Sequence, residues 1–212
     1  MKLYGYYRSS AAYRVRIALN LKGLGYESAF VHLRKGEQRA PEYLKLNPQG
    51  LAPTLVDGEA TLTQSLAILE YLEEVHPRPA LLPRDPVGRA RVRALSLAIA
   101  CDIHPLNNLK VLRYLQKDLG LEEAARNAWY HRWVNDGFAA IEKQLAAPET
   151  GRFCHGEQPT MADVCLVPQT YNAERLKVDL EPYPRLRRIV AEARALPTFA
   201  QAAPEAQPDF EP

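Results

Sequence analysis

The sequence predicts an α/β domain of element order βαβ-ββα over residues 1–80, followed by an all-α domain over residues 87–212. Three observations lead to this division. The spacing of apolar residues changes repeatedly in the first region, and it becomes uniformly helical in the second. A proline-dense segment separates the two, reading Pro77-Arg78-Pro79 and then Leu82-Pro83-Arg84-Asp85-Pro86. A chain of 212 residues is long enough for one large or two small domains.

The first region opens with a predicted strand, helix and strand. Residues 2–6 are few and rich in aromatic side chains, as in a strand. Apolar residues recur at helical spacing over residues 11–24, and the charged residues fall on other faces of this helix: Arg14, Arg16 and Lys22. Residues 27–33 alternate like a second strand. Because a helix links the two strands, we expect them to be parallel and the βαβ unit to be right-handed.

Local turn signals predict the ββα half of the first region. A polar segment reads as helical over residues 41–46 and ends at Asn47-Pro48-Gln49-Gly50. Residues 54–56 and 60–62 read as short strands around Asp57-Gly58, the strongest hairpin signal in the chain. Residues 64–75 return to helical spacing and stop before Pro77.

Beyond the connector, apolar residues follow helical spacing over four segments: residues 88–115, 121–145, 161–176 and 185–195. Pro105 lies inside the first of these segments and should kink it. Thr160 and Asp163 form a capping box at the start of the third. Residues 203–212 are rich in proline and predict an extended tail.

Composition excludes several classes of protein. The net charge of +2 provides no strong field for binding nucleic acid. The longest apolar run, residues 94–101, is closed by Arg93 and Asp102 and is too short to cross a bilayer. The first residues lack the features of a signal peptide, and three widely spaced cysteines without a C-x-x-C pair predict neither disulfides nor a metal site. We therefore expect a soluble protein of the reducing cytoplasm.

The order of elements resembles that of the cytosolic glutathione transferases, in which a thioredoxin-like domain precedes a helical domain. The run Arg8-Ser9-Ser10-Ala11-Ala12-Tyr13-Arg14-Val15-Arg16-Ile17-Ala18-Leu19 resembles the zeta-class signature, Ser-Ser-Cys-x-Trp-Arg-Val-Arg-Ile-Ala-Leu. Ala11 stands at its cysteine and Tyr13 at its tryptophan, so we expect substrate handling to be tuned rather than lost. Similar runs follow in the family's order at residues 64–74, 81–83, 102–108 and 172–175, so the resemblance covers nearly the whole chain.

This resemblance implies a glutathione-dependent enzyme in which Ser9 is catalytic. A free thiol has a pKa of about 8.5, so little of it is thiolate at neutral pH. Ser9 and Ser10, together with the first amides of the helix, would bind the sulfur and favour its anion. From the residues alone, Ser9 could be a simple helix N-cap. Tyr4, Tyr6 and Tyr7 are rivals for the role of Ser9, and we expect them to pack beside the strand.

The resemblance also implies further glutathione-binding positions. Ala52 would present its backbone before a cis Pro53, although a proline can also simply begin an edge strand. Gln64 and Ser65 would bind the γ-glutamyl carboxylate at the start of a helix, where Ser65 or Thr63 could instead be only an N-cap. The remaining positions are Gln38, His104 and Asn108, of which Asn108 could face a dimer partner instead.

Zeta-class enzymes are maleylacetoacetate isomerases, and the resemblance implies this reaction. The glutathione thiolate adds to the double bond of a cis-enone diacid, the bond rotates, and glutathione leaves unchanged. A dianionic substrate requires cations, for which Arg8 and Arg175 are the first candidates and Lys110 and Arg14 the weaker ones. His104 would move a proton or orient the substrate, and a purely structural role is its alternative.

Three rival functions stay open at this point. Maleylpyruvate is a closely related diacid that the sequence does not distinguish from maleylacetoacetate. A conjugating or dehalogenating transferase could use the same scaffold, and so could a non-catalytic assembly protein, although Ser9, Gln64 and Ser65 speak against the latter. The resemblance implies a cytoplasmic homodimer that acts in aromatic amino-acid catabolism, including that of tyrosine, without nucleic-acid or membrane partners.

Overall fold

The computed structural model describes residues 1–211, which divide into two compact units. The first unit holds Met1–Leu81 together with the described residues from Arg194 onward. The second unit holds Leu82–Ala193. No helix within residues 1–211 is long and apolar enough to cross a membrane.

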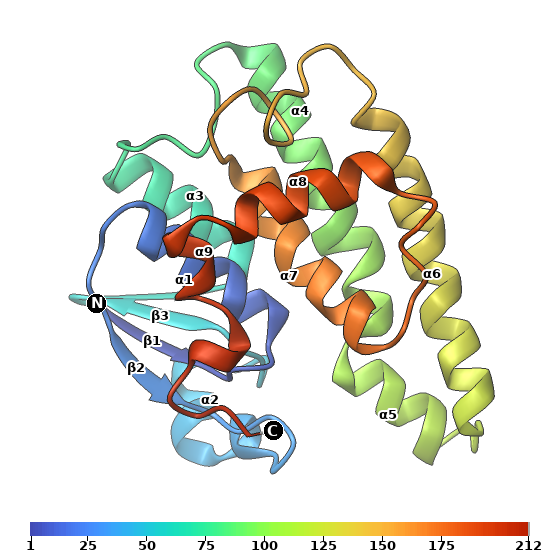
Figure 1. The fold of residues 1–212 in the computed structure, drawn as a ribbon. Coiled ribbons are helices and arrows are strands. Elements are labelled where there is room, and N and C mark those ends of the chain that lie inside the picture. Colours follow the sequence, from blue (N-terminus) through green and yellow to red (C-terminus); the bar gives the residue numbers. More distant parts are fainter. Residues whose placement is uncertain (212) are drawn as a thin grey trace. The chain divides into compact units, whose positions relative to one another are not determined.

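A four-stranded mixed sheet forms the centre of the first unit (Figure 1). Its strands are β1 (Lys2–Gly5), β2 (Glu27–Phe30), β3 (Thr54–Asp57) and β4 (Ala60–Thr63), in the order β2-β1-β3-β4. Strand β1 pairs in parallel with β2 and antiparallel with β3, and β3 and β4 form a hairpin. The hairpin turns at Gly58, whose φ of 57° suits a residue without a Cβ. The predicted βαβ-ββα order is confirmed.

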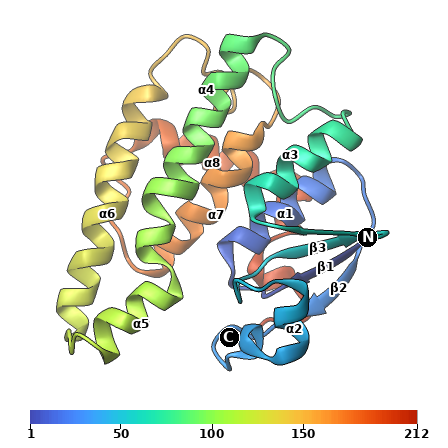
Figure 2. The ribbon, with the colours of Figure 1, turned by 180° about the vertical axis from the view of Figure 1, so that it is seen from behind.

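Helices α1 (Ser10–Leu21) and α3 (Ser65–Val75) pack against each other in this unit, and α2 (Pro41–Leu46) follows a 3₁₀ turn at Glu37–Arg39 (Figure 2). The core is aliphatic, with fully buried side chains on α1, β3 and α3: Val15, Ile17, Leu55, Ile68, Leu69 and Leu72. The charged side chains that the helical spacing placed on other faces of α1 are buried as well. Arg14, Arg16 and Lys22 are 2%, 4% and 7% exposed, because each is held by polar partners inside the unit.

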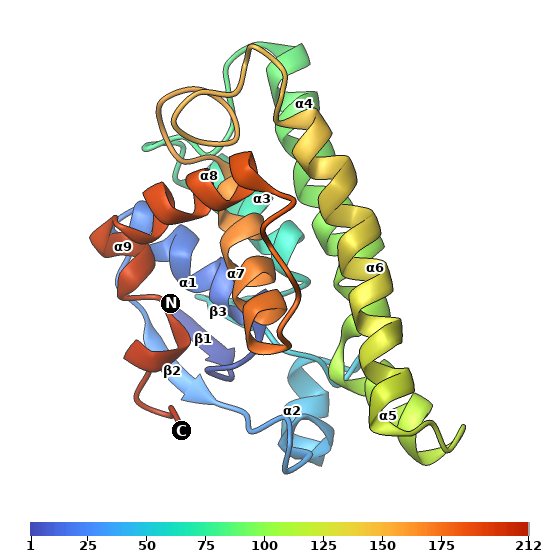
Figure 3. The same cartoon turned by 45° about the vertical axis from the view of Figure 1, so that its right-hand side comes forward.

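The second unit is helical, with α4 (Pro86–Leu97), α5 (Leu109–Lys117), α6 (Glu123–Gln144), α7 (Met161–Arg175) and α8 (Pro184–Arg194). Helix α4 packs against α7, and α6 packs against the turn that follows α4, as can be followed in Figure 3. The segment predicted as one kinked helix over residues 88–115 is instead divided into α4, a π-helical turn (Ala98–Ile103), a 3₁₀ turn (Pro105–Asn107) and α5. Proline lacks an amide hydrogen, so the helical hydrogen-bond ladder stops at Pro105.

The predicted capping box opens α7. Asp163 Oδ2 accepts the Thr160 backbone amide at 2.7 Å and the Thr160 hydroxyl at 2.8 Å, and Oδ1 accepts the Cys154 amide at 2.8 Å. Asp163 is fully buried, and this desolvation raises the pKa of its carboxyl, while the hydrogen bonds oppose the rise. The box therefore joins the start of α7 to the loop before it.

The residues after α8 return to the first unit. Helix α9 (Pro197–Ala200) packs on α1, where Asn20 Nδ2 donates to the Thr198 carbonyl at 3.0 Å. Arg16 Nε donates to the Ala202 carbonyl at 2.9 Å. The sequence predicted an extended tail over residues 203–212; its described part contains a 3₁₀ turn at Pro204–Ala206 and reaches Tyr7.

Candidate active site

Ser9 lies at the N-cap of α1, directly after a tight turn that follows β1. The Ser9 amide donates to the Tyr6 carbonyl at 2.9 Å, and Ser9 Oγ accepts the Ala12 amide at 3.2 Å. The N-cap alternative is therefore correct as a structural description, and it is compatible with a chemical role. Since the oxygen lone pair takes the Ala12 amide, the hydroxyl proton remains a donor for an anion. Ser10 begins the helix beside it and is 5% exposed.

The three N-terminal tyrosines pack as expected. Tyr6 and Tyr7 are 4% and 1% exposed and contact each other edge to face, with ring centroids 4.6 Å apart. Burial raises the pKa of Tyr6 well above its ordinary value, and its contact with Tyr7 adds to the rise. Tyr4 contacts the ring of Tyr43 with centroids 6.1 Å apart. With its pKa raised, the Tyr6 hydroxyl is a poor alternative to Ser9 in the catalytic role.

The start of α3 is a second helix N-terminus that could bind an anion. Gln64 occupies the N-cap position with φ of 67° and ψ of 115°, a backbone conformation that a side chain disfavours. Neither Ser65 nor Thr63 is the N-cap, and within the described chain no side chain caps this helix. Its first amides therefore stay available to a ligand. Gln64 Nε2 donates to Gln49 Oε1 at 2.7 Å, which fixes its amide group.

Electrostatics favour an anion at both helix starts. The first turns of α1 and α3 contain no acidic residue, so nothing in them neutralises the positive end of the helix dipole. Ser65 Oγ accepts Arg14 Nη1 at 3.2 Å, and Ser65 is 6% exposed. Because this oxygen accepts from a cation, the Ser65 hydroxyl keeps its own proton for a carboxylate.

The loop before β3 is held firmly. The Ala52–Pro53 peptide bond is cis, as the resemblance implied, and β3 begins at the next residue. Asn47 Nδ2 and the Tyr43 hydroxyl both donate to the Leu51 carbonyl, at 2.7 and 2.6 Å. Ala52 thus lies in a backbone whose neighbours on both sides are fixed, as a site for pairing with a peptide requires.

Gln38 lies in the 3₁₀ turn between β2 and α2. Its side chain is 9% exposed, and within residues 1–211 its Oε1 atom is buried without a hydrogen-bond partner. A buried amide oxygen in this state costs free energy unless a ligand or water donates to it. This residue fits a tripeptide, which brings its own amide donors.

The predicted residues of the second unit cluster on two elements. His104 follows the π-helical turn, and its amide donates to the Ile99 carbonyl at 2.9 Å. Asn108 caps α5, because its Oδ1 accepts the amides of Lys110 and Val111 at 3.1 and 3.2 Å. The side-chain oxygen of Asn108 is thus already occupied by hydrogen bonds from α5 amides. Lys110 is exposed.

Arg175 lies at the C-terminal end of α7 and is exposed. Burial raises the pKa of the Tyr130 hydroxyl, and the charge of Arg175 opposes this rise, so the two groups lie within electrostatic reach. Arg8, in the first unit, lies with its guanidinium carbon 5.2 Å from the Tyr7 ring centroid. The position of Arg8 over this ring favours the cation.

Two residues beside the predicted ones were missed. Gln49 holds the Gln64 amide, and only its place in the Asn-Pro-Gln-Gly turn could have drawn attention to it. Asn107 is 9% exposed, and among the described residues neither its Oδ1 nor its Nδ2 has a hydrogen-bond partner. Of the adjacent residues Asn107 and Asn108, the sequence prediction names only Asn108, which caps α5.

Comparison with known proteins agrees with this geometry. Residues 1–74 match the glutathione S-transferase N-terminal domain, and residues 123–192 match the C-terminal domain. A protein of Vibrio cholerae named probable maleylacetoacetate isomerase is 54% identical over 98% of this chain and 97% of its own.

Two solved structures are also similar. A maleylpyruvate isomerase described as a bacterial zeta-class glutathione S-transferase is 51% identical, with a TM-score of 0.98 and full coverage of both chains. The maleylacetoacetate isomerase of Anaeromyxobacter dehalogenans, solved with glutathione in its active site, is 45% identical with a TM-score of 0.88, covering 99% of this chain and 97% of its own. The chain therefore belongs to the zeta class of the glutathione S-transferase family.

Proposed function

We propose that this chain is a glutathione-dependent isomerase that converts maleylacetoacetate to fumarylacetoacetate. One observation carries the proposal: the Ser9 oxygen accepts the Ala12 amide, so its hydroxyl hydrogen can donate to a ligand at the start of α1. It is made in a chain that is 54% identical over nearly its full length to a probable maleylacetoacetate isomerase. The bound glutathione of the Anaeromyxobacter relative supports the choice of cofactor.

Glutathione, when bound, supplies a thiolate that adds to the double bond of the substrate and leaves again unchanged. The Ser9 hydroxyl donates a hydrogen bond to the sulfur. Ser10 and the first amides of α1 add positive potential beside it. A thiol pKa lowered by two units corresponds to about 2.7 kcal/mol of preferential binding of the anion. The Ser9 hydroxyl stabilises the thiolate in this way only while it is directed at the sulfur.

The tripeptide is held by groups from three places in the first unit. Ser65 and Gln64 bind the γ-glutamyl carboxylate with the first amides of α3. The Ala52 backbone pairs with the cysteine residue of the ligand, and the unpartnered Gln38 oxygen accepts from its glycine end. The resemblance to the family adds His104 and Asn108 of the helical domain as candidates, and Asn108 would use its amide nitrogen because its oxygen caps α5.

The substrate is a dianion, so its two carboxylates require cations. Arg8 lies one residue before Ser9 and binds one of them, and Arg175 binds the other with the fork of its guanidinium. His104 orients the substrate or moves a proton, and Lys110, which is exposed, adds longer-range attraction. We assign residues 1–80 to the glutathione-binding domain and the helical residues from 87 to Ala193 to the substrate-binding domain, because the described residues from Arg194 onward belong to the first unit.

We further infer a cytoplasmic homodimer. The chain matches both domains of the glutathione S-transferase family, and this family fold supports the dimer and the small-molecule substrate. None of its three cysteines forms a disulfide within residues 1–211, as a reducing compartment favours.

Maleylpyruvate is the second candidate substrate. The supporting observation is the TM-score of 0.98 with a maleylpyruvate isomerase, at 51% identity. The two diacids differ in the arm beyond the ketone, which no residue named above distinguishes.

One assay tests these assignments. Purified protein and glutathione are mixed with each diacid in turn, the loss of the cis-enone is followed by absorbance, and total thiol is measured at the end. We expect turnover without loss of glutathione, whereas a conjugating or dehalogenating transferase would consume it. Ser9→Ala should lose about 100-fold in kcat/KM, as removal of a donor to a reacting anion does, while Ser9→Thr retains a hydroxyl and most of the rate.

Two results would overturn the proposal. Full activity of Ser9→Ala would remove Ser9 from the catalytic role. Failure to bind glutathione at millimolar concentration in calorimetry would favour a non-catalytic assembly protein.

A further inference from the structure

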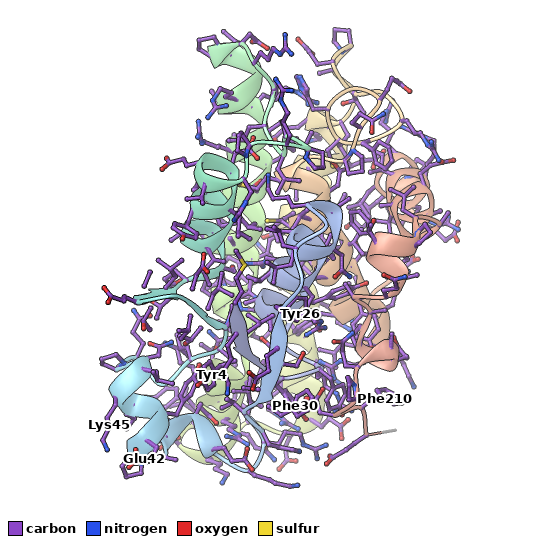
Figure 4. The ribbon with its side chains drawn as sticks, turned by 90° about the vertical axis from the view of Figure 1, so that its left-hand side faces the viewer. Tyr4, Tyr26, Phe30, Glu42, Lys45 and Phe210 are labelled. Atoms are coloured by element: carbon purple, nitrogen blue, oxygen red, sulfur yellow. The ribbon has the colours of Figure 1, made fainter. Side chains whose placement is uncertain are left out.

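The residues that follow α9 form a segment, residues 204–211, which we call the terminal segment. It returns beside β2 of the first unit (Figure 3). Gln207 and Asp209 line the same small hollow as Ser28 and Ala29 of β2. Figure 4 shows Phe210 of this segment and Phe30, the last residue of β2, at the same end of the unit. The terminal segment therefore ends close to the turn that precedes Ser9.

Tyr7 is the residue of that turn which the terminal segment contacts. Asp209 Oδ2 accepts the Tyr7 backbone amide at 2.9 Å, and the Tyr7 hydroxyl donates to the Glu211 carbonyl at 2.9 Å. The Phe210 ring contacts the Tyr7 ring edge to face, with centroids 5.4 Å apart. Three consecutive residues of the segment thus hold one residue of the turn, across more than 200 positions of sequence.

The carbonyl of the same residue is held from the opposite direction. Arg16 Nη2 donates to the Tyr7 carbonyl at 3.0 Å, and Arg16 is 4% exposed. The charge of Asp209 acts on this guanidinium and opposes the effect of burial on its pKa. The backbone of Tyr7 is therefore fixed between an anion at its amide and a cation at its carbonyl.

Ser9 depends on this arrangement because it is attached to the same turn. Its amide donates to the Tyr6 carbonyl, so the turn from Tyr6 to Ser9 moves as one piece. Strand β1 has ended at Gly5, and the Tyr7 amide therefore has no strand partner. The carboxylate of Asp209 takes the place of that partner.

We infer that Asp209 is a positioning residue for Ser9, fixing the turn so that the Ser9 hydroxyl is directed at the glutathione sulfur. The inference rests on the proposed catalytic role of Ser9. Asp209 does not contact the ligand in this account and acts only through the Tyr7 backbone. The terminal segment is then part of the catalytic apparatus, although it lies at the far end of the sequence.

The test is a spectroscopic titration of glutathione bound to the full-length protein, in which thiolate absorbance is followed against pH. Four variants are compared with the wild type: Asp209→Ala, Asp209→Asn, Ser9→Ala and Glu59→Gln. Glu59 is an exposed carboxylate in the β3–β4 turn and serves as the matched charge control. Calorimetry measures glutathione binding, and thermal unfolding measures stability.

We expect Asp209→Ala to raise the pKa of the bound thiol by about 0.5 to 1 unit, because a less well directed hydroxyl stabilises the anion less. Asp209→Asn keeps an acceptor for the Tyr7 amide, so it should restore most of the wild-type titration. Glu59→Gln should leave the titration unchanged. A chain ending at Pro208 removes the Asp209 acceptor together with the Phe210 and Glu211 contacts to Tyr7, so it should raise the pKa of the bound thiol at least as much as Asp209→Ala.

The outcomes separate the two proposals. If Ser9→Ala leaves the thiol titration unchanged, the catalytic assignment of Ser9 fails and the positioning role fails with it. If Ser9→Ala raises the thiol pKa but Asp209→Ala and the shortened chain titrate like Glu59→Gln, only the positioning role is overturned. A lowered melting temperature with an unchanged thiol pKa would likewise reduce Asp209 to a structural residue.

Discussion

Arg14 donates from Nη1 to Ser65 Oγ at 3.2 Å, and both side chains are buried. The cation therefore lies behind the helix start at which glutathione would place its γ-glutamyl carboxylate. We expect Arg14→Met to raise KM for glutathione about 10-fold, equivalent to roughly 1.4 kcal/mol, because Ser65 loses its orientation and the site loses a charge. Steady-state kinetics at varied glutathione measures this.

Arg14→Lys provides the control for that prediction. It keeps the charge but replaces the planar guanidinium with a compact ammonium group, so the increase in KM should be smaller. At saturating glutathione, kcat should stay near the wild-type value for both variants. A KM for Arg14→Met within twofold of the wild type would contradict a link between Arg14 and the ligand.

Gln64 combines an unfavourable backbone conformation with a side-chain amide that we propose binds glutathione, and two variants separate these properties. Gln64→Ala removes the amide but keeps the Cβ at φ of 67°, whereas Gln64→Gly removes both. Backbone strain of this kind costs about 1–3 kcal/mol. We therefore expect Gln64→Gly to unfold at a higher denaturant concentration than Gln64→Ala.

Glutathione affinity should fall in both Gln64 variants, because both lose the amide group that Gln49 orients. Chemical denaturation and calorimetry measure the two effects independently. Equal stability of the glycine and alanine variants would mean that residue 64 stores no strain.

Lys22 and Glu73 form a buried ion pair with Nζ and Oε2 2.9 Å apart. Lys22 Nζ also donates to the carbonyls of His76 and Pro79, and Glu73 Oε2 accepts the Leu81 amide. The pair thus joins the end of α1 to the end of α3 and the segment after it. We expect Glu73→Gln to lower the free energy of unfolding by about 3 kcal/mol, because an uncompensated ammonium group remains buried.

The double variant Lys22→Met with Glu73→Met is the informative partner of Glu73→Gln. Removing both charges leaves no uncompensated ion, so a substantial part of the lost stability should return. Urea unfolding of the two proteins decides the point. A double variant less stable than Glu73→Gln would show that the pair contributes more than mutual neutralisation.

The sequence predicted the order and type of the elements in the first unit because their signals are local. Apolar spacing, a Gly58 turn and the proline-rich connector need no knowledge of distant residues. Helix α1 shows the limit of such signals. Arg14, Arg16 and Lys22 lie outside its apolar spacing, yet all three are buried. Their partners are Ser65 and Glu73 on α3 and Ala202 just after α9, which periodicity cannot identify.

The candidate site divides in the same way. Ser9 and Ser65 could be named from the sequence because they stand in runs that resemble a known signature next to predicted helix starts. Gln49 could not, because its contact with Gln64 depends on how two loops fold together. Asp209 is the extreme case, since its partner Tyr7 is 202 positions away and neither residue belongs to a motif that names the other.

Glu211 should make attachment of the terminal segment depend on pH. Its carboxylate lies 3.2 Å from His32 Nε2 and 3.7 Å from Lys35 Nζ, and chiefly the hydrogen bond to His32 lowers its pKa below the ordinary 4.5. A carboxyl with a lowered folded-state pKa stabilises the attached state above pH 4.5, and this contribution is lost as pH falls through the lower value. The protection of the Tyr7 amide from hydrogen exchange should therefore decrease below pH 4.5, and less steeply in Glu211→Gln. The groups are exposed and screened by salt, so the difference between the two proteins should shrink at high ionic strength. An identical pH profile for wild type and Glu211→Gln at low salt would assign the attachment to Asp209 and Phe210 alone.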